Sequence, residues 1–312
     1  SGTWTKVGGD IVGNADDRLY EVSLSSDGTR VAIGAPYASI YGNHPTYQYG
    51  GLVRIYDLIN SAWVQVGVDL EGEKSLDQFG WSSSFSSDGS IVAIGARPRW
   101  QFNKPNLDFE GYVAIYKYTP TGVTSWTQLG DNIYGKAYKD FSGYSVSLSS
   151  DGTRVAIGVP YNDDNGYDMG AVRIYDYDGD EWVKVGPDLY GESYLRTDNM
   201  STSPADFFGM GVSLSSDGSI VAIGAPYHDG DTQTKNDNRG EVKIFEVSSG
   251  ESYQYIWDVD SGGAPSDGTY TATVAGADLA GNNYSGTDSI TFTLDTSAPT
   301  VTLTDTDSDN LV

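Results

Sequence analysis

The stretch that decides the fold is Ser25-Ser26-Asp27-Gly28, followed by the apolar run TRVAIGAP at 29–36. The same tetrapeptide returns with its aspartate at Asp88, Asp151 and Asp217, at steps of 61, 63 and 66 residues. A near-identical run follows it each time: SIVAIGARP (90–98), TRVAIGVP (153–160) and SIVAIGAP (219–226). A period of this length is the signature of similar structural units joined in an array.

Two further runs complete each unit. One begins with glycine: GLVRIYDL (51–58), GYVAIYKY (111–118), GAVRIYDY (170–177) and GEVKIFEV (240–247). The other begins with tryptophan: WTKVGGDI (4–11), WVQVGVDL (63–70), WTQLGDNI (126–133) and WVKVGPDL (182–189). The runs are short, rich in Val, Ile and Tyr, and alternate with a period of two, which is typical of strands, and Asp-Gly favours a tight turn. Four antiparallel strands every ~60 residues predict an all-β fold built of β-propeller blades.

The order of the runs predicts how the ring closes. The chain opens on a tryptophan run, and the last unit ends near 247 without one. We expect the strand at 4–11 to complete the blade of 207–247, which removes two exposed edges and closes a four-bladed propeller over 1–250. The other blades are predicted at about 18–70, 79–133 and 141–189. The alternative is that further repeats lie upstream and that the ring is larger.

Composition excludes several functional classes. The 312 residues carry a formal net charge of −25, which argues against nucleic acid and anionic membranes as partners, because both need clustered cations. Without cysteine there is no disulfide, zinc thiolate or thiol nucleophile. No apolar run approaches the ~20 residues of a membrane span, so we expect no membrane insertion.

The repeat resembles a known family. Phe79-Gly80 with Gly95-Ala96, and Phe208-Gly209 with Gly224-Ala225-Pro226, are similar to the FG-GAP repeats of integrin alpha-chain propellers. The first copy departs from the pattern, with Arg18-Leu19 in place of Phe-Gly. The resemblance implies a propeller used in cell adhesion and extracellular recognition, located outside the cell or on its surface. The family's calcium loop is not carried over, because each repeat keeps only the single carboxylate of its SSDG turn.

The period fails after residue 250. The run DGTYTATVAGADLAGNN and the following FTLDTSAPTVTLTDTD resemble bacterial immunoglobulin-like modules of large surface proteins. We expect a partial immunoglobulin-like β-sandwich at 251–296, and the start of a further module or a linker at 297–312. Asp305, Asp307 and Asp309 alternate, so their carboxylates can converge on one calcium ion, although a solvated acidic linker has the same pattern.

A ligand-binding face is predicted at one end of the blades. The long loops that differ between repeats gather there, and such loops often carry function on a rigid scaffold. Their rings and polar groups suit a glycan or an extended peptide, and Arg97 and Arg99 offer a docking point for an acidic group. The predicted ligand-binding residues are Tyr37, Tyr41, Tyr47, Arg97, Arg99, Trp100, Tyr161, Asp163, Asp164, Tyr227, His228 and Asp229. The other reading is that these rings only cap the blades.

The expected function is non-catalytic recognition. No Gly-x-Ser-x-Gly, His-Glu-x-x-His or phosphate-loop motif occurs, and the two histidines do not pair, so no catalytic residue is predicted. We expect an adhesion module of a larger bacterial surface or secreted protein that binds a glycan or protein on another cell or matrix and adjoins other modules of its polypeptide. The alternatives are a polysaccharide-active enzyme with carboxylates at the propeller channel and a purely structural spacer.

Overall fold

The computed structural model describes residues 2–40, 49–99, 110–120, 125–191, 206–228 and 240–246, and the backbone of three strands near the C-terminus. The chain divides into two compact units, Ser1–Glu251 and Ser252–Val312. All regular structure in the described ranges is β, as predicted. None of these residues belongs to a helix long and apolar enough to cross a membrane.

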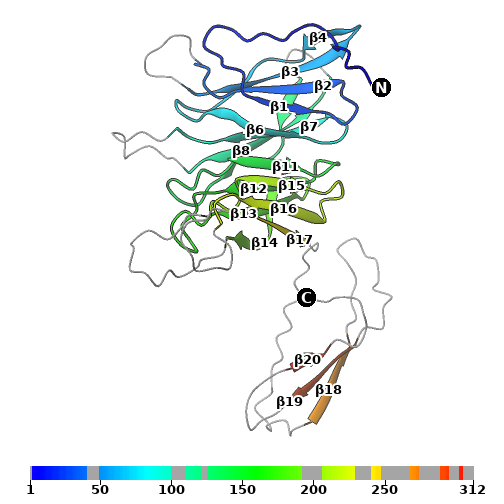
Figure 1. Ribbon diagram of the computed structural model, residues 1–312. Coiled ribbons are helices and arrows are strands. Elements are labelled where there is room, and N and C mark those ends of the chain that lie inside the picture. The colour runs from blue at the N-terminus through cyan, green and yellow to red at the C-terminus, as the bar shows by residue number, and fades with distance from the viewer. Residues whose placement is uncertain are drawn as a thin grey trace. The chain divides into compact units, whose positions relative to one another are not determined.

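The first unit contains four antiparallel sheets, which follow one another in chain order (Figure 1). The first comprises β1 (Glu21–Leu24), β2 (Arg30–Ala35), β3 (Leu52–Ile59), β4 (Ala62–Gln65) and β5 (Leu70–Glu71). The second comprises β6 (Phe79–Phe85), β7 (Ile91–Ala96), β8 (Tyr112–Tyr118), β9 (Trp126–Gln128) and β10 (Ile133–Tyr134). The third comprises β11 (Ser145–Leu148), β12 (Arg154–Val159), β13 (Ala171–Tyr177) and β14 (Trp182–Tyr190). The fourth has three strands among the described residues: β15 (Gly211–Leu214), β16 (Ile220–Ala225) and β17 (Glu241–Glu246).

Neighbouring sheets pack face to face, as propeller blades do. Three of the four apolar clusters lie between two consecutive sheets: Val53 and Ile55 of β3, for example, share one cluster with Phe85 and Ile94 of the second sheet. The structure is therefore an all-β, propeller-like stack in which the repeats supply both sides of every interface.

The SSDG segments form the predicted turns between the first two strands of each sheet. In the first turn the Asp27 carboxylate accepts hydrogen bonds from the Ser25 hydroxyl and the Thr29 backbone N–H, while Gly28 takes a φ of 70°. The Thr29 N–H, followed by the hydroxyls of Ser25 and Thr29, holds the pKa of Asp27 below its usual value. Each aspartate is therefore a turn former, as predicted.

Backbone hydrogen bonds join the successive turns into a ladder. The N–H of Ser26 donates to the carbonyl of Ser87, Ser87 donates to Ser150, and Ser150 donates to Ser216, at 2.8–2.9 Å. The same residue of each repeat thus fixes the register of one sheet on the next.

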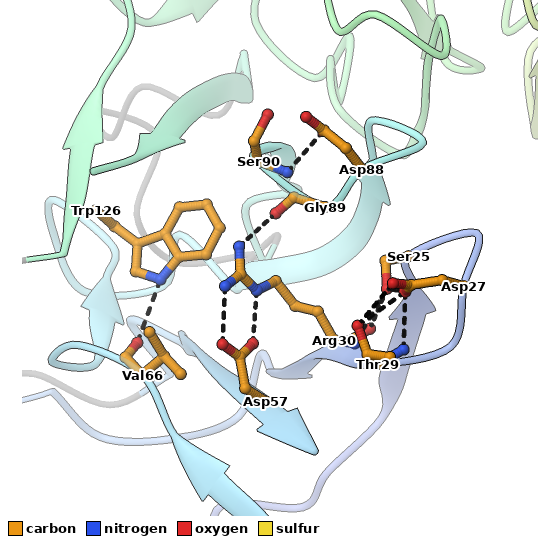
Figure 2. Close-up of polar contacts among 10 residues, drawn as sticks. All are labelled: Ser25, Asp27, Thr29, Arg30, Asp57, Val66, Asp88, Gly89, Ser90 and Trp126. Atoms are coloured by element: carbon orange, nitrogen blue, oxygen red, sulfur yellow. Dashed lines mark hydrogen bonds and ion pairs between the residues drawn. The ribbon is translucent and has the colours of Figure 1, made fainter. Parts of the chain in front are cut away.

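An arginine strengthens the interface between the first two sheets (Figure 2). Arg30 donates two hydrogen bonds to the Asp57 carboxylate of its own sheet, at 2.6 and 2.8 Å. It donates a third to the carbonyl of Gly89, in the SSDG turn of the second sheet. Its guanidinium also lies 4.0 Å from the centroid of the Tyr118 ring. Arg154 repeats the arrangement with Asp176. A bidentate pair of this kind is the strongest geometry available to arginine.

A glycine in the second strand of each of the first three sheets permits close approach of the next sheet. A Cβ at Gly158 would overlap the carbonyl oxygen of Gly209 in the fourth sheet, and Gly34 and Gly95 stand in the same relation to their neighbours. At each of these three glycines the next sheet approaches through a backbone carbonyl oxygen.

The tryptophans contact the preceding repeat. The indole N–H of Trp126 donates to the carbonyl of Val66 (Figure 2), and that of Trp182 donates to Leu129. Trp63 donates in the same way to Val7, so residues 4–11 lie in front of the first sheet, where the tryptophan run of a preceding repeat would lie. They form no strand and do not pair with β15–β17. The predicted closure of the ring by 4–11 is therefore wrong.

Both ends of the stack expose apolar faces. Val22 on β1 is 68% exposed, and Val242 and Ile244 on β17 are 68% and 70% exposed. Leu19 stands at the position of Gly80, where a Cβ would lie 2.8 Å from the carbonyl oxygen of Leu52. A side chain there does not fit the tight packing that joins the other sheets, so the first sheet cannot receive another sheet in that geometry.

The second unit contains one described sheet, in the order β18 (Gly268–Thr273), β19 (Ser289–Leu294) and β20 (Thr302–Thr304). Since β20 pairs with β19, residues 302–304 belong to this sheet, whereas the sequence placed them at the start of a further module or in a linker. The immunoglobulin-like assignment remains a prediction.

Candidate functional site

A strained turn precedes the first strand of each sheet. Arg18, Gln78, Phe141 and Phe207 all take left-handed backbone angles, with φ between 50° and 52°. Such angles are costly for residues other than glycine and cluster at functional sites. The turn brings three of these four side chains, all except Gln78, against tyrosines at the same end of the strands.

A buried aspartate anchors each of these turns. The four are at most 6% exposed: Asp17, Asp77, Asp140 and Asp206. Asp140 pairs with Arg173 at 3.4 Å, and Asp17 pairs with Arg54. Sequence reasoning missed this set, although three of its members stand eleven residues before the aspartate of the next SSDG turn (88 − 77, 151 − 140, 217 − 206).

Seven aromatic side chains form a continuous row across all four sheets. In order of contact they are Tyr37, Tyr20, Trp81, Tyr144, Tyr161, Phe207 and Tyr227, and we call them the aromatic strip. Successive ring centroids lie 4.9–6.3 Å apart, within the range of direct aromatic contact. Tyr20 and Tyr227 are 56% and 46% exposed, and the other five rings are half-buried.

Two tyrosine hydroxyls of the strip, those of Tyr20 and Tyr144, stay protonated at neutral pH. Burial raises the pKa of Tyr20, and Tyr144 and Tyr37 raise it further, while Arg97 lowers it. Burial likewise raises the pKa of Tyr144. These phenols can therefore donate as well as accept hydrogen bonds at neutral pH.

Three predicted ligand residues lie on this strip, and two predicted arginines lie beside it. The structure brings Tyr37, Tyr161 and Tyr227 into one row, as the predicted face requires. Arg97 lies 4.3 Å from the Trp81 centroid, and Arg99 lies 4.5 Å from that of Tyr49.

Four residues of the strip were not predicted from the sequence: Tyr20, Trp81, Tyr144 and Phe207. The first three each stand seven residues before the aspartate of their SSDG turn, so a recurring aromatic at a fixed offset was the signal.

The loop at 161–169 carries acidic groups beside the strip. Asp163 accepts a hydrogen bond from the N–H of Asp168 at 2.7 Å, and the Asp168 carbonyl accepts one from the N–H of Phe207. Burial is the largest cause that raises the pKa of Asp168 to about 6, and the negative charge of Asp163 is the second. Asp163 and Asp164 are exposed, as a ligand-binding role requires.

His228 is not available to a ligand. It is 4% exposed, and its Nδ1 lies 3.0 Å from Asp206, the buried aspartate of its repeat. The position of His228 on a long loop gave no indication that its side chain turns inward.

Several predicted residues lie outside the described ranges. These are Tyr41, Tyr47, Trp100 and Asp229, and the calcium candidates Asp305, Asp307 and Asp309. Within the described ranges, no group of three or more His, Asp or Glu side chains is arranged to hold a metal ion. Calcium binding at the acidic tail remains a prediction.

Comparison with known proteins gives limited likenesses. No protein-family model and no curated protein matches the chain. Among solved structures it is similar to Kuenenia stuttgartiensis hydrazine synthase, with 12% identity and a TM-score of 0.41, over 97% of this chain and 70% of that one.

Two further solved structures are similar. A putative 6-phosphogluconolactonase from Bacteroides fragilis has 14% identity and a TM-score of 0.39, over 58% of this chain and 42% of that one. The periplasmic gluconolactonase of Pseudomonas aeruginosa has 13% identity and a TM-score of 0.38, over 91% and 70%.

All three neighbours carry the names of enzymes. They contradict the expectation that the chain is not an enzyme, and that expectation is withdrawn. Their TM-scores lie below 0.5, so none of their activities is transferred to this chain.

Proposed function

We propose that the aromatic strip binds an extended glycan. The observation that carries this proposal is the continuity of seven rings across four sheets. Half-buried rings offer broad apolar faces to a sugar chain, and the tyrosine hydroxyls supply hydrogen bonds at their edges. A long row suits a polymer better than a compact molecule, which needs a cavity.

The biological setting remains part of the proposal. The chain would act as a recognition module of a larger surface or secreted protein, outside the cell, with the ligand presented by another cell or by a matrix. The FG-GAP-like and immunoglobulin-like resemblances of the sequence support this setting.

Binding to a polysaccharide panel tests the proposal. Immobilised polygalacturonate, dextran sulfate and dextran are the probes. Trp81→Ala and Tyr20→Ala should each weaken retention of the protein, because they interrupt the row at its third and second rings. Tyr134→Ala is the matched control: this tyrosine is 44% exposed, contacts Tyr112 and lies off the strip. If the strip variants bind as the parent does, the site lies elsewhere.

A second candidate function is action on the bound chain. Asp168, whose pKa is raised to about 6, stands next to the exposed Asp163 and is tied to Phe207 of the strip. A carboxylic acid with a raised pKa beside a second carboxylate is the arrangement that glycoside hydrolysis uses. This pair lies on a loop, whereas the sequence-based alternative placed the carboxylates at a propeller channel.

Release of reducing ends from the same polysaccharides tests this candidate. Asp168→Asn should abolish product formation, whereas Asp180→Asn, a change of the same kind in the exposed turn between β13 and β14, should keep it. If Asp168 is the general acid, the rate should fall as the pH rises through about 6. No product at any pH would exclude catalysis on these substrates.

A further inference from the structure

The described arginines fall into two groups. Four of the seven pair with aspartates: Arg30 with Asp57, Arg54 with Asp69, Arg154 with Asp176 and Arg173 with Asp188. The other three, Arg18, Arg97 and Arg99, have no carboxylate partner within the described residues and lie instead on aromatic rings. In a chain with 43 acidic and 18 basic side chains, this segregation sets the three apart.

Arg97 is the most constrained of the three. Its guanidinium lies between the rings of Trp81 and Phe141, 4.3 and 5.2 Å from their centroids, with Tyr144 at 5.4 Å. Its Nε is buried and has no hydrogen-bond partner among the described atoms. Ring contacts stabilise the positive charge but do not use the Nε–H donor, and a buried donor without a partner is costly.

Arg18 and Arg99 extend the cationic region toward the Tyr37 end of the strip. Arg18 lies 5.6 Å from the centroid of Tyr37, and Arg99 lies 4.5 Å from that of Tyr49. Tyr37 and Tyr49 are themselves in edge contact, so the two exposed guanidinium groups flank one pair of rings. The carboxylates of the 161–169 loop lie at the other half of the strip, which gives it a charge polarity.

We infer that the ligand of the aromatic strip is an acidic polysaccharide. Its carboxylate or sulfate groups pair with Arg97, Arg18 and Arg99, while its sugar rings lie on the aromatic faces. This inference rests on the proposed function and names its ligand class. The planar guanidinium fork matches both kinds of anion. The overall charge of −25 does not prevent binding, because at physiological salt repulsion is screened beyond ~8 Å while short ion pairs persist.

Titration calorimetry at physiological salt separates the contribution of the ligand's charge to affinity from the contribution of the aromatic rings. The probes are polygalacturonate, the same polymer fully methyl-esterified, dextran sulfate and neutral dextran. We expect tight binding of polygalacturonate or dextran sulfate and a loss of about tenfold or more on esterification, as removal of a charged hydrogen bond implies. The stronger of the two acidic polymers identifies the anion.

Two arginine variants and one control complete the experiment. Arg97→Gln and Arg99→Gln should each weaken binding of the acidic polymer, whereas Lys6→Gln, a cation on the exposed segment before the first sheet, should not. Arg99 is exposed, so its variant remains informative if Arg97→Gln fails to fold.

Different results would contradict the acidic ligand and the glycan-binding strip. Equal binding of the acid and its ester, unaffected by Arg97→Gln and Arg99→Gln but lost in Trp81→Ala, would overturn the acidic ligand and retain the glycan strip. Binding of no polymer, or binding that Trp81→Ala leaves intact, would overturn the proposed function itself.

Discussion

Gly158 has no side chain, and this lets the residues that begin the fourth sheet pack closely on the third sheet. Replacing it with alanine places a methyl group against the carbonyl oxygen of Gly209 and against the Ser145 hydroxyl. The backbone of Gly158 suits alanine, so the cost comes from the interface alone.

The size of the effect follows from what must move. Overpacking of a tight interface costs about 1–3 kcal/mol. The hydrogen bond from the Ser145 hydroxyl to the Gly209 carbonyl, 2.8 Å long, contributes about 1 kcal/mol more when the sheets separate. Gly158→Ala should therefore lower the free energy of unfolding by about 3 kcal/mol and the melting temperature by roughly 6–12 °C.

Gly224 is the matched control for this variant. It occupies the same place in the fourth sheet, but the nearest atom to a Cβ there lies 3.9 Å away. Gly224→Ala should leave the melting temperature unchanged or raise it slightly, since alanine lowers the entropy of the unfolded chain. Calorimetric scans of both variants decide the matter. Equal destabilisation would mean that the last sheet is covered like the others, and a neutral Gly158→Ala would refute the close packing.

Three further substitutions test individual contacts. Burial raises the pKa of Asp77 to about 6, so its ionisation costs the fold free energy above that pH and nothing below about 4. Asp77→Asn should gain up to about 3 kcal/mol over the parent between pH 4 and 7 in urea titrations, and a constant difference would contradict the shift. Trp126→Phe should lose about 1 kcal/mol with its hydrogen bond to Val66, seen as a lower denaturation midpoint. Arg30→Lys cannot form the two-point contact with Asp57, so it should lower the melting temperature more than Lys6→Gln does.

The repeat made most of the fold predictable. SSDG followed by an apolar run specifies a turn and a strand locally, and the structure has both in all four copies. The position of 4–11 could not be read in this way, because a tryptophan run suits either end of a stack. The position of 4–11 depends on a tertiary contact, the hydrogen bond from the Trp63 indole to the Val7 carbonyl. Leu19 contributes as well, because its side chain does not fit where the other repeats have a tightly packed glycine.

The candidate site was predictable only in part. Tyr37, Tyr161 and Tyr227 directly follow the apolar run of their repeat, so the sequence places them at the start of the long loops. Trp81 lies inside a strand, where a ring is usually a core residue, and only the packing of successive sheets reveals that it joins a row. The inward turn of His228 depends on Asp206, 22 residues away, which no local pattern indicates.

The dependence of affinity on chain length tests the glycan strip most directly. Galacturonate oligomers of increasing length, from the dimer upward, should bind with steadily falling dissociation constants, at least about tenfold lower for the longest than for the dimer, as more rings from Tyr37 to Tyr227 are covered. Trp81→Ala should flatten this dependence. A constant affinity at every length would show a single-point site and contradict the account.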